Sequence, residues 1–188
     1  MARLMVLGML RTKQMSGYEL QQLLQVSEVD KWAGILPGSI YHALKKMDKE
    51  GLVRVANVES TGHRTKAIYE ITPEGEEEYK KLLVEAFRHT TVHLPVELYT
   101  GLSMLNLSNH QGEPDTLIRA TQERITELKG KMNELEAGLK IKSQYIQLNE
   151  LTRLTFQNML DQYQLHIDFL EKIIKTMNAG NIGDKREG

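Results

Sequence analysis

The chain contains no cysteine and has no long hydrophobic segment, and both absences narrow what it can be. Without cysteine it has no disulfide framework, no thiolate nucleophile and no cysteine-ligated zinc site. No run of residues approaches the roughly 18 apolar positions that a membrane-spanning helix needs, and the first residues lack the basic, apolar and small-residue regions of a secretory signal. We therefore expect a soluble cytoplasmic protein without a membrane partner.

The usual signatures of catalysis are also missing. The sequence has no GxSxG nucleophile elbow, no Walker phosphate-binding loop and no GxGxxG dinucleotide motif. His89, His93 and Glu97 recur at four-residue spacing, which on a helix would place three metal-capable side chains on one face. Pro95 interrupts that helix, and no other cluster of metal ligands is visible. We expect no enzymatic activity, no cofactor and no metal site.

Length and charge leave room for a binding protein. With 188 residues and 40% apolar content, the chain can form two small domains, each with its own core. The formal net charge of -1 argues against a uniformly basic surface. A nucleic-acid site would therefore have to arise from local clustering of basic residues.

Helical periodicity dominates the first fifty residues. Leucines and methionines at near-helical spacing predict a short helix within 2–13, and Ser16 with Glu19 forms a capping-box pattern that begins a second helix. A third helix begins at Pro37, with an apolar side formed by Ile40, Ala43, Leu44 and Met47. Its other side is basic, with no acidic residue in the first two turns, and carries His42, Lys45, Lys46 and Lys49.

A β-hairpin is predicted next. The segments 52–58 and 66–72 have high β-propensity, and the polar segment 59–65 between them predicts a seven-residue loop. The tip of that loop exposes His63 and Arg64, with Lys66 close behind. A further helix begins after Thr72, with a predicted core-facing stripe of Tyr79, Leu82, Leu83, Ala86 and Phe87.

The order helix, helix, helix, strand, strand, helix is that of a winged helix-turn-helix, in which the third helix enters the DNA major groove and the hairpin lies along neighbouring phosphates. The basic residues fall on those two elements. Three segments of the first half, "SGYEL", "LPGSIYHALKKMDKEGLV" and "HRTKAIYEITPEG", also resemble the PadR family of transcriptional regulators.

This resemblance implies a DNA-binding set on the recognition helix and the wing, comprising Ser39, Tyr41, His42, Lys45, Lys46, Arg64 and Lys66. His42 stands where the family usually has proline or another small residue, a departure that could shift base preference. Tyr41 lies at the edge of the buried face, so it either has a purely structural role or packs against the wing while its hydroxyl reaches a phosphate. Trp32 is expected to pack in the core rather than stack on a ligand.

Two long helical seams follow a short helix and a polar linker. Apolar residues alternate at spacings of three and four in 118–139 and again in 156–177, which predicts an antiparallel hairpin or a pair of helices that docks on a second chain. The resemblance implies that these helices form a homodimer. The expected interface residues are Ile125, Leu128, Met132, Leu135, Leu139, Phe156, Leu160, Tyr163, Ile167, Leu170 and Ile174.

The sequence thus predicts a mainly α-helical chain with a small β-hairpin: a winged helix-turn-helix domain in 1–92, an all-α coiled dimerisation domain in 93–179 and a flexible tail in 180–188. The expected function is a sequence-specific transcriptional repressor, acting as a homodimer on a palindromic operator in double-stranded DNA. The resemblance adds a small aromatic effector. The alternative is a winged-helix module for protein–protein interaction, which should tolerate a neutral wing tip, whereas DNA binding needs Arg64 and Lys66.

Overall fold

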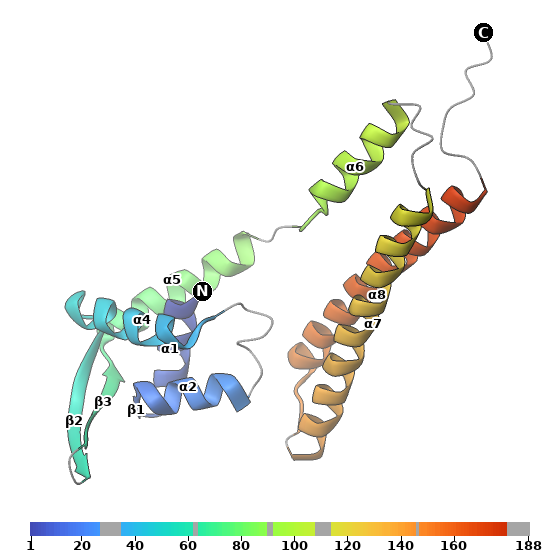
Figure 1. Cartoon of the computed structure of the whole chain (residues 1–188). Coiled ribbons are helices and arrows are strands. Elements are labelled where there is room, and N and C mark those ends of the chain that lie inside the picture. Colours follow the sequence, from blue (N-terminus) through green and yellow to red (C-terminus); the bar gives the residue numbers. More distant parts are fainter. Residues whose placement is uncertain (27–34, 62–63, 90–91, 108–113, 146, 180–188) are drawn as a thin grey trace. The chain divides into compact units, whose positions relative to one another are not determined.

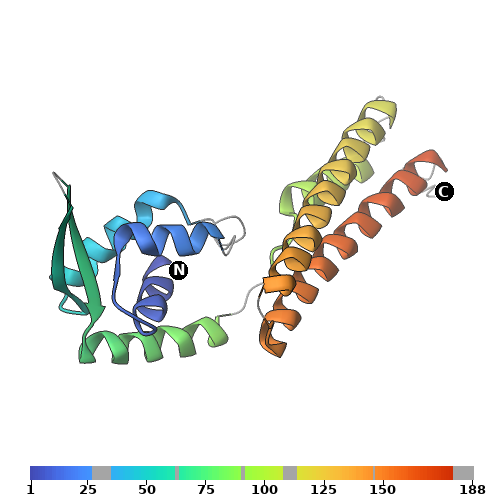
Figure 2. The same ribbon diagram turned by 90° about the horizontal axis from the view of Figure 1, so that it is seen from below.

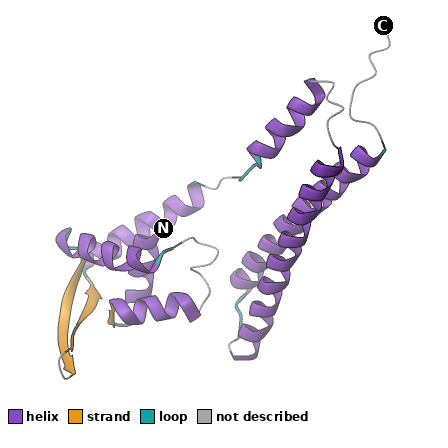
Figure 3. Cartoon of the chain, viewed as in Figure 1, coloured by secondary structure: helices purple, strands orange, loops and turns teal. Residues whose placement is uncertain are grey.

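The computed structural model describes residues 1–26, 35–61, 64–89, 92–107, 114–145 and 147–179 (Figure 1). The chain divides into two compact units, Met1–His93 and Leu94–Gly188. Helices form most of the described chain, and the strands are confined to the first unit (Figure 3). The predicted fold class, mainly α with a small antiparallel sheet, is confirmed. No helix in the described ranges is long and apolar enough to cross a membrane.

In its described residues, the N-terminal unit contains four helices and a three-stranded sheet. Its elements are, in order, α1 (Ala2–Leu10), β1 (Met15–Ser16), α2 (Gly17–Val26), α4 (Pro37–Lys49), β2 (Val53–Thr61), β3 (Arg64–Ile71) and α5 (Pro73–Arg88). The strands are antiparallel in the order β1-β3-β2, so that β3 lies in the centre. Strand β1 was not predicted, because two residues are too few to show a period.

Local hydrogen bonds explain where two of these helices begin. The backbone N–H of Ser16 donates to the Glu19 carboxylate at 2.8 Å, and the N–H of Glu19 donates to the Ser16 hydroxyl at 3.2 Å. The predicted capping box is therefore confirmed. At the start of α5, the Thr72 hydroxyl accepts from the N–H of Gly75 at 3.1 Å and donates to the carbonyl of Gly51 at 2.7 Å. The predicted cap at Thr72 is likewise confirmed.

The predicted seven-residue hairpin loop is wrong. Strand β2 continues to Thr61 and β3 begins at Arg64, so only residues 62–63 connect them. Glu59 pairs with Lys66 in the ladder, and Ser60 pairs with Thr65. Backbone groups form the ladder whatever the side chains are, so a polar stretch can extend a hairpin without an apolar signal.

The core of the N-terminal unit lies between α1, α2, α4 and the sheet. Its buried residues are Val6, Leu7, Leu10, Met15, Leu20, Leu24, Ile35, Ile40, Leu44, Met47 and Val53. Tyr79 and Leu82 of α5 pack against this core, but the rest of the predicted α5 stripe does not: Leu83 is 38% exposed, Phe87 is 77% exposed and Ala86 is also exposed. The sixteen-residue α5 is longer than the nine-residue α1 that it contacts, and its last turns extend beyond the core.

The C-terminal unit contains α6 (Val96–Leu107), α7 (Pro114–Tyr145) and α8 (Glu150–Asn178). Helices α7 and α8 run antiparallel and side by side in two perpendicular views (Figures 1 and 2). The side chain of Asn149 caps α8 by accepting from the N–H of Thr152 at 2.8 Å. Within one chain the two seams therefore form the antiparallel hairpin, the first of the two predicted arrangements.

Candidate nucleic-acid interface

One side of α4 is buried and the other is basic. Ile40, Leu44 and Met47 are each at most 2% exposed. The spacing of three and four that buries them leaves Tyr41, His42, Lys45 and Lys46 exposed, as predicted from the sequence. Among the described residues, no ion pair involves Lys45 or Lys46, so their charges are available to a polyanion.

The start of α4 suits an anionic partner. Leu36 caps the helix in an extended conformation, and the first turn contains no acidic residue. The Ser39 hydroxyl donates to the carbonyl of Leu36 at 2.5 Å. That bond uses its only proton and leaves the oxygen free to accept a hydrogen bond. The positive end of the helix dipole and the exposed cations thus lie on the same element.

Tyr41 packs against the start of α2. A side-chain carbon added at Gly17 would lie 2.6 Å from the Tyr41 ring, so glycine at that position makes room for the ring. The side chain of Tyr41 is nevertheless 49% exposed. Tyr41 therefore packs at the start of α2, where the prediction named the wing, and the contact of its hydroxyl with a phosphate stays a prediction.

The wing, which we define as β2 with β3, extends past the helices of its unit (Figures 1 and 2). Arg64 opens β3 opposite Thr61, but its side chain and the whole of His63 lie outside the described part of the chain. Lys66 differs from the lysines of α4 because it has partners. Its ammonium nitrogen lies 3.3 Å from a carboxylate oxygen of Glu19 and 3.8 Å from one of Glu59.

The Glu19 carboxylate connects three parts of the N-terminal unit. Hydrogen bonds from the backbone N–H and hydroxyl of Ser16, and then the Lys66 ammonium, hold the pKa of Glu19 below its usual value. The carboxylate is therefore charged at neutral pH. Sequence analysis identified the capping box but missed the link to Lys66, because the two residues are distant in sequence and meet only through sheet pairing.

The helical metal cluster considered from the sequence does not form on one helix. His89 is the C-cap that follows α5, and Glu97 belongs to α6. In the described ranges no three histidine or acidic side chains come together as a possible metal site. Trp32, which was predicted to pack in the core, lies outside the described residues.

The predicted dimer residues lie along the α7–α8 seam. Four of them, Ile125, Leu128, Ile167 and Leu170, are at most 4% exposed in a single chain. The others are half-buried, namely Met132, Leu135, Leu139, Phe156, Leu160, Tyr163 and Ile174. Within one chain the buried part of the seam is therefore the end formed by the first half of α7 and the second half of α8, against which leucines of α6 also pack. A spacing pattern alone does not distinguish these partners from a second chain.

An apolar row of three exposed leucines, interrupted by Asn158, Asp161 and Gln162, lies on the opposite side of α8 and was not predicted. Leu151, Leu154 and Leu165 are 73%, 56% and 72% exposed. Their separations of three and eleven residues, about one and three helical turns, place them on one face. The signal was present in the sequence as a second set of leucines out of phase with the seam.

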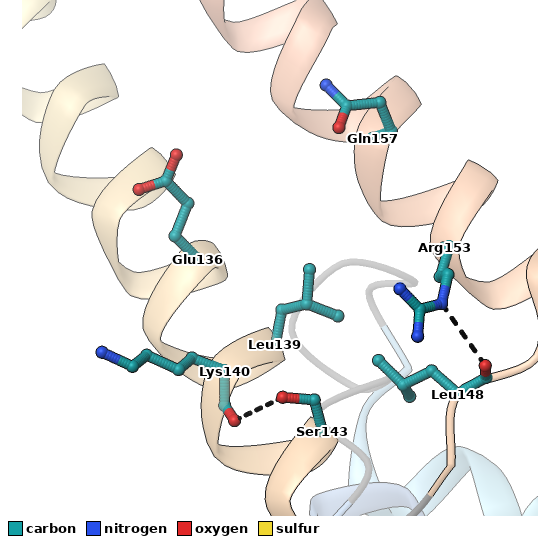
Figure 4. A pocket seen from close by; sticks show the side chains of 7 residues that line it. All are labelled: Glu136, Leu139, Lys140, Ser143, Leu148, Arg153 and Gln157. Carbon is teal, nitrogen blue, oxygen red and sulfur yellow. Dashed lines mark hydrogen bonds between the residues drawn. The ribbon is translucent and has the colours of Figure 1, made fainter.

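A hollow of about 860 Å³ lies in the described part of the C-terminal unit, between α6 and the α7–α8 hairpin. Its lining is mostly apolar and includes Arg124 and His166. A smaller hollow, about 360 Å³, lies near the end of the hairpin (Figure 4). There Ser143 donates to the carbonyl of Lys140 at 2.8 Å and Arg153 to that of Leu148 at 3.5 Å, while the Lys140 amine points away from Arg153. Its polar groups do not converge on one point.

Comparison with known proteins agrees with this geometry. Residues 6–81 match the family model described as "Transcriptional regulator PadR-like family". No curated protein sequence gives a significant match. The matched range contains the whole of α2, α4 and the wing, and thus the basic face of α4.

Solved structures are similar over nearly the full length. PadR of Bacillus subtilis in complex with operator DNA is 20% identical, with a TM-score of 0.70, covering 93% of this chain and 98% of that chain. The same protein in complex with p-coumaric acid is 19% identical, with a TM-score of 0.72 and coverages of 94% and 98%. The virulence activator AphA of Vibrio cholerae is 22% identical, with a TM-score of 0.67 and coverages of 95% and 99%. The two-unit fold is therefore shared.

Proposed function

We propose that this chain, a member of the PadR-like family of DNA-binding transcriptional regulators, is a cytoplasmic repressor that binds a palindromic operator as a homodimer. The observation that carries the proposal is the exposed basic side of α4, where His42, Lys45 and Lys46 follow a helix start without acidic residues. A helix with this surface can enter a major groove, where side chains distinguish base edges.

Different residues of the proposed interface have different roles. Ser39 and His42, near the start of α4, are expected to contact base edges, and Ser39 would accept from a base donor because its own proton is engaged with Leu36. Lys45 and Lys46 are expected to reach the phosphate backbone or base edges, and Arg64 to contact phosphates. Phosphate contacts provide affinity without sequence information.

The exposed leucines of α8 support dimerisation. A row of large apolar side chains opposite the intrachain seam is a typical surface for a second copy of the chain. We propose that Leu151, Leu154 and Leu165 lie in the dimer interface, in addition to the half-buried residues predicted from the seam. A two-fold dimer would present two copies of α4 to a palindromic site.

A small aromatic effector is part of the proposal. Bacillus subtilis PadR has been crystallised with p-coumaric acid, and this chain has a mostly apolar groove whose lining includes Arg124. An aromatic ring would bury its faces against the apolar side chains, while a carboxylate would compete for the Arg124 guanidinium with Glu127, which lies 2.6 Å from it. p-Coumaric acid is the first probe to titrate, and we expect it to weaken DNA binding.

The DNA-binding proposal is tested with a duplex selected by the wild-type protein from a random-sequence library. Binding to this duplex and to a scrambled duplex is measured by fluorescence anisotropy at several salt concentrations. The wild type should prefer the selected duplex, with an affinity that falls steeply with salt. The double variant Lys45→Ala/Lys46→Ala should flatten the salt dependence by roughly one to two units.

The matched control is Lys80→Ala/Lys81→Ala, which removes the same charge from α5. It should keep the wild-type salt dependence. If the wild type does not discriminate between the two duplexes, the repressor proposal fails and the protein-interaction alternative replaces it.

The dimer proposal is tested separately by sedimentation. The variant Leu151→Ser/Leu154→Ser/Leu165→Ser should be monomeric at concentrations where the wild type is dimeric, because the buried seam is untouched while the apolar row is removed. Phe87→Ser, which removes an exposed apolar residue of α5, is the control and should stay dimeric. A triple variant that sediments as a dimer would place the interface elsewhere.

A further inference from the structure

The outer part of the wing has support from the sheet on one side only. Strand β1 pairs with β3 through just Met15–Tyr69 and Ser16–Ile68. Further toward the tip, β3 is paired with β2 alone, and a two-stranded ribbon is marginally stable in water. Lys66 is in this outer part, two residues beyond the last β1 partner.

Beyond the end of β1, the Glu19 carboxylate of α2 lies beside β3. One oxygen of Glu19 accepts from both the N–H and the hydroxyl of Ser16, each at 2.8 Å, and its other oxygen faces the Lys66 ammonium at 3.3 Å. Ser16 is only 2% exposed, so the carboxylate is anchored to a buried residue. Its orientation toward the wing is therefore fixed by the helix cap and not by Lys66.

The charge of Lys66 is locally compensated. Besides Glu19, its ammonium faces Glu59, the residue opposite it on β2, at 3.8 Å. Two carboxylates around one ammonium give a net negative cluster. By contrast, Lys45 and Lys46 have no carboxylate partner among the described residues. Lys66 is thus poorly placed to attract a phosphate.

We propose that Lys66 is a positioning residue that braces the wing against the start of α2 through Glu19, and so sets how the wing meets DNA. The inference rests on the proposed DNA binding and revises the predicted phosphate contact of Lys66. The phosphate contacts are left to α4 and Arg64.

This proposal predicts that removing a negative charge from the DNA-binding unit weakens its binding to DNA. Glu19→Gln removes a negative charge from the DNA-binding unit, which by charge alone would strengthen binding to a polyanion. If Glu19 instead holds the wing in place through Lys66, the same change weakens binding. Glutamine also serves as the acceptor in a capping box, so α2 keeps its cap.

The experiment is a double-mutant cycle in the full-length protein, with the selected and scrambled duplexes. Glu19→Gln and Lys66→Gln should each weaken binding to the selected duplex by about two- to fivefold, the range of partly exposed ion pairs. The double variant should be no weaker than either single variant, because both lose the same interaction. Lys66→Gln should keep the wild-type salt dependence.

Glu59→Gln is the matched control, because it removes the other carboxylate near Lys66 without touching α2. It should bind as tightly as the wild type or more tightly. A readout without DNA accompanies the cycle: amide hydrogen exchange in 64–67 should be faster in Glu19→Gln than in Glu59→Gln.

Two results would contradict the proposed positioning role of Lys66. One is a Glu19→Gln variant that binds as well as or better than the wild type. The other is a Lys66→Gln variant whose salt dependence falls by about one unit, as expected for a lost phosphate contact. A wild type that does not distinguish the duplexes would instead defeat the proposed function, and the exchange measurement would still decide whether Glu19 steadies the wing.

Discussion

The two units bury apolar side chains in different ways. Among the described residues of the N-terminal unit, eleven buried hydrophobic residues from helices and strands form one cluster that is covered on several sides. The C-terminal unit is of similar length, but its described residues bury six along the α7–α8 seam, and Leu151, Leu154 and Leu165 are exposed. Two antiparallel helices cover one side of each other, and α6 adds cover at one end of the seam only. A layered unit can therefore complete its core with one chain, whereas the helical hairpin has apolar surface left for a second.

The largest expected effect is the loss of stability when one large buried side chain of each core is truncated. Leu7 and Ile167 are both 0% exposed, so Leu7→Ala and Ile167→Ala should each cost about 3–5 kcal/mol of unfolding free energy. If only the C-terminal unit is completed by a second chain, the unfolding that Ile167→Ala affects should depend on protein concentration. Urea unfolding followed by circular dichroism at two protein concentrations measures both.

The same urea measurement can disprove this difference between the two units. Unfolding of the N-terminal unit, reported by Leu7→Ala, should be independent of concentration. A concentration dependence in both transitions would show that the N-terminal unit also needs its partner.

Replacing a glycine by alanine should change the stability by a smaller amount, destabilising the N-terminal unit and stabilising the C-terminal unit. A side-chain carbon at Gly75 would overlap the carbonyl oxygen of Leu52, so Gly75→Ala should cost about 2–3 kcal/mol. Gly130 has nothing within 4 Å in the middle of α7, so Gly130→Ala should stabilise by about 0.5–1 kcal/mol. Thermal unfolding of the two variants tests this, and a destabilised Gly130→Ala would indicate that this face of α7 is closely covered in solution.

The smallest expected effect is the response of the two units to low pH. The pKa values of Glu19 and Glu127 both lie below their usual value, mainly through hydrogen bonds from Ser16 in one case and Lys131 in the other. A carboxyl group whose pKa is lowered by folding stabilises the fold at higher pH, and this contribution is lost as pH falls through the folded-state pKa. Glu19 links α2 to the wing, whereas the partners of Glu127, Lys131 and Arg124, are on α7 itself.

Acidification below about pH 4.5 should therefore loosen the wing before it affects the α7–α8 seam. Backbone NMR shifts of β3 and α7 between about pH 3 and pH 6 measure this. Glu19→Gln is the control that should remove the response of residues 64–67, whereas Glu70, whose pKa is lowered mainly by a hydrogen bond from Arg54, still titrates on the same strand. Shifts in 64–67 that titrate unchanged in that variant would assign the effect to another carboxylate.

Much of the fold was predictable where side chains act locally. The caps at Ser16 and Thr72 and the start of α4 at Pro37 each depend on neighbours within four residues, and all three are observed. The basic side of α4 followed from the same spacing that buries Leu44. The helical period of 3.6 residues, together with the capping residues, was sufficient to predict these features.

Features that depend on distant contacts were not predictable. The length of the wing was underestimated because backbone pairing carries polar residues such as Glu59 into the ladder. The α5 stripe was overestimated because nothing in Phe87 and its neighbours shows where the facing helix ends. The partner of Lys66 depends on the register between β1 and β3, which two residues cannot specify in advance.

Strand β1 also constrains the order in which the N-terminal unit folds. It joins β3 across the whole of α2, α4 and β2, whereas the β2–β3 and α7–α8 hairpins each join neighbouring elements. Contacts close in sequence form early because little loop entropy is lost, and those that close a long loop form late. During synthesis, β1 must therefore wait until β3 has emerged before the three-stranded sheet can form, and α1 must wait longer still for α5, whereas the wing can pair locally before either contact.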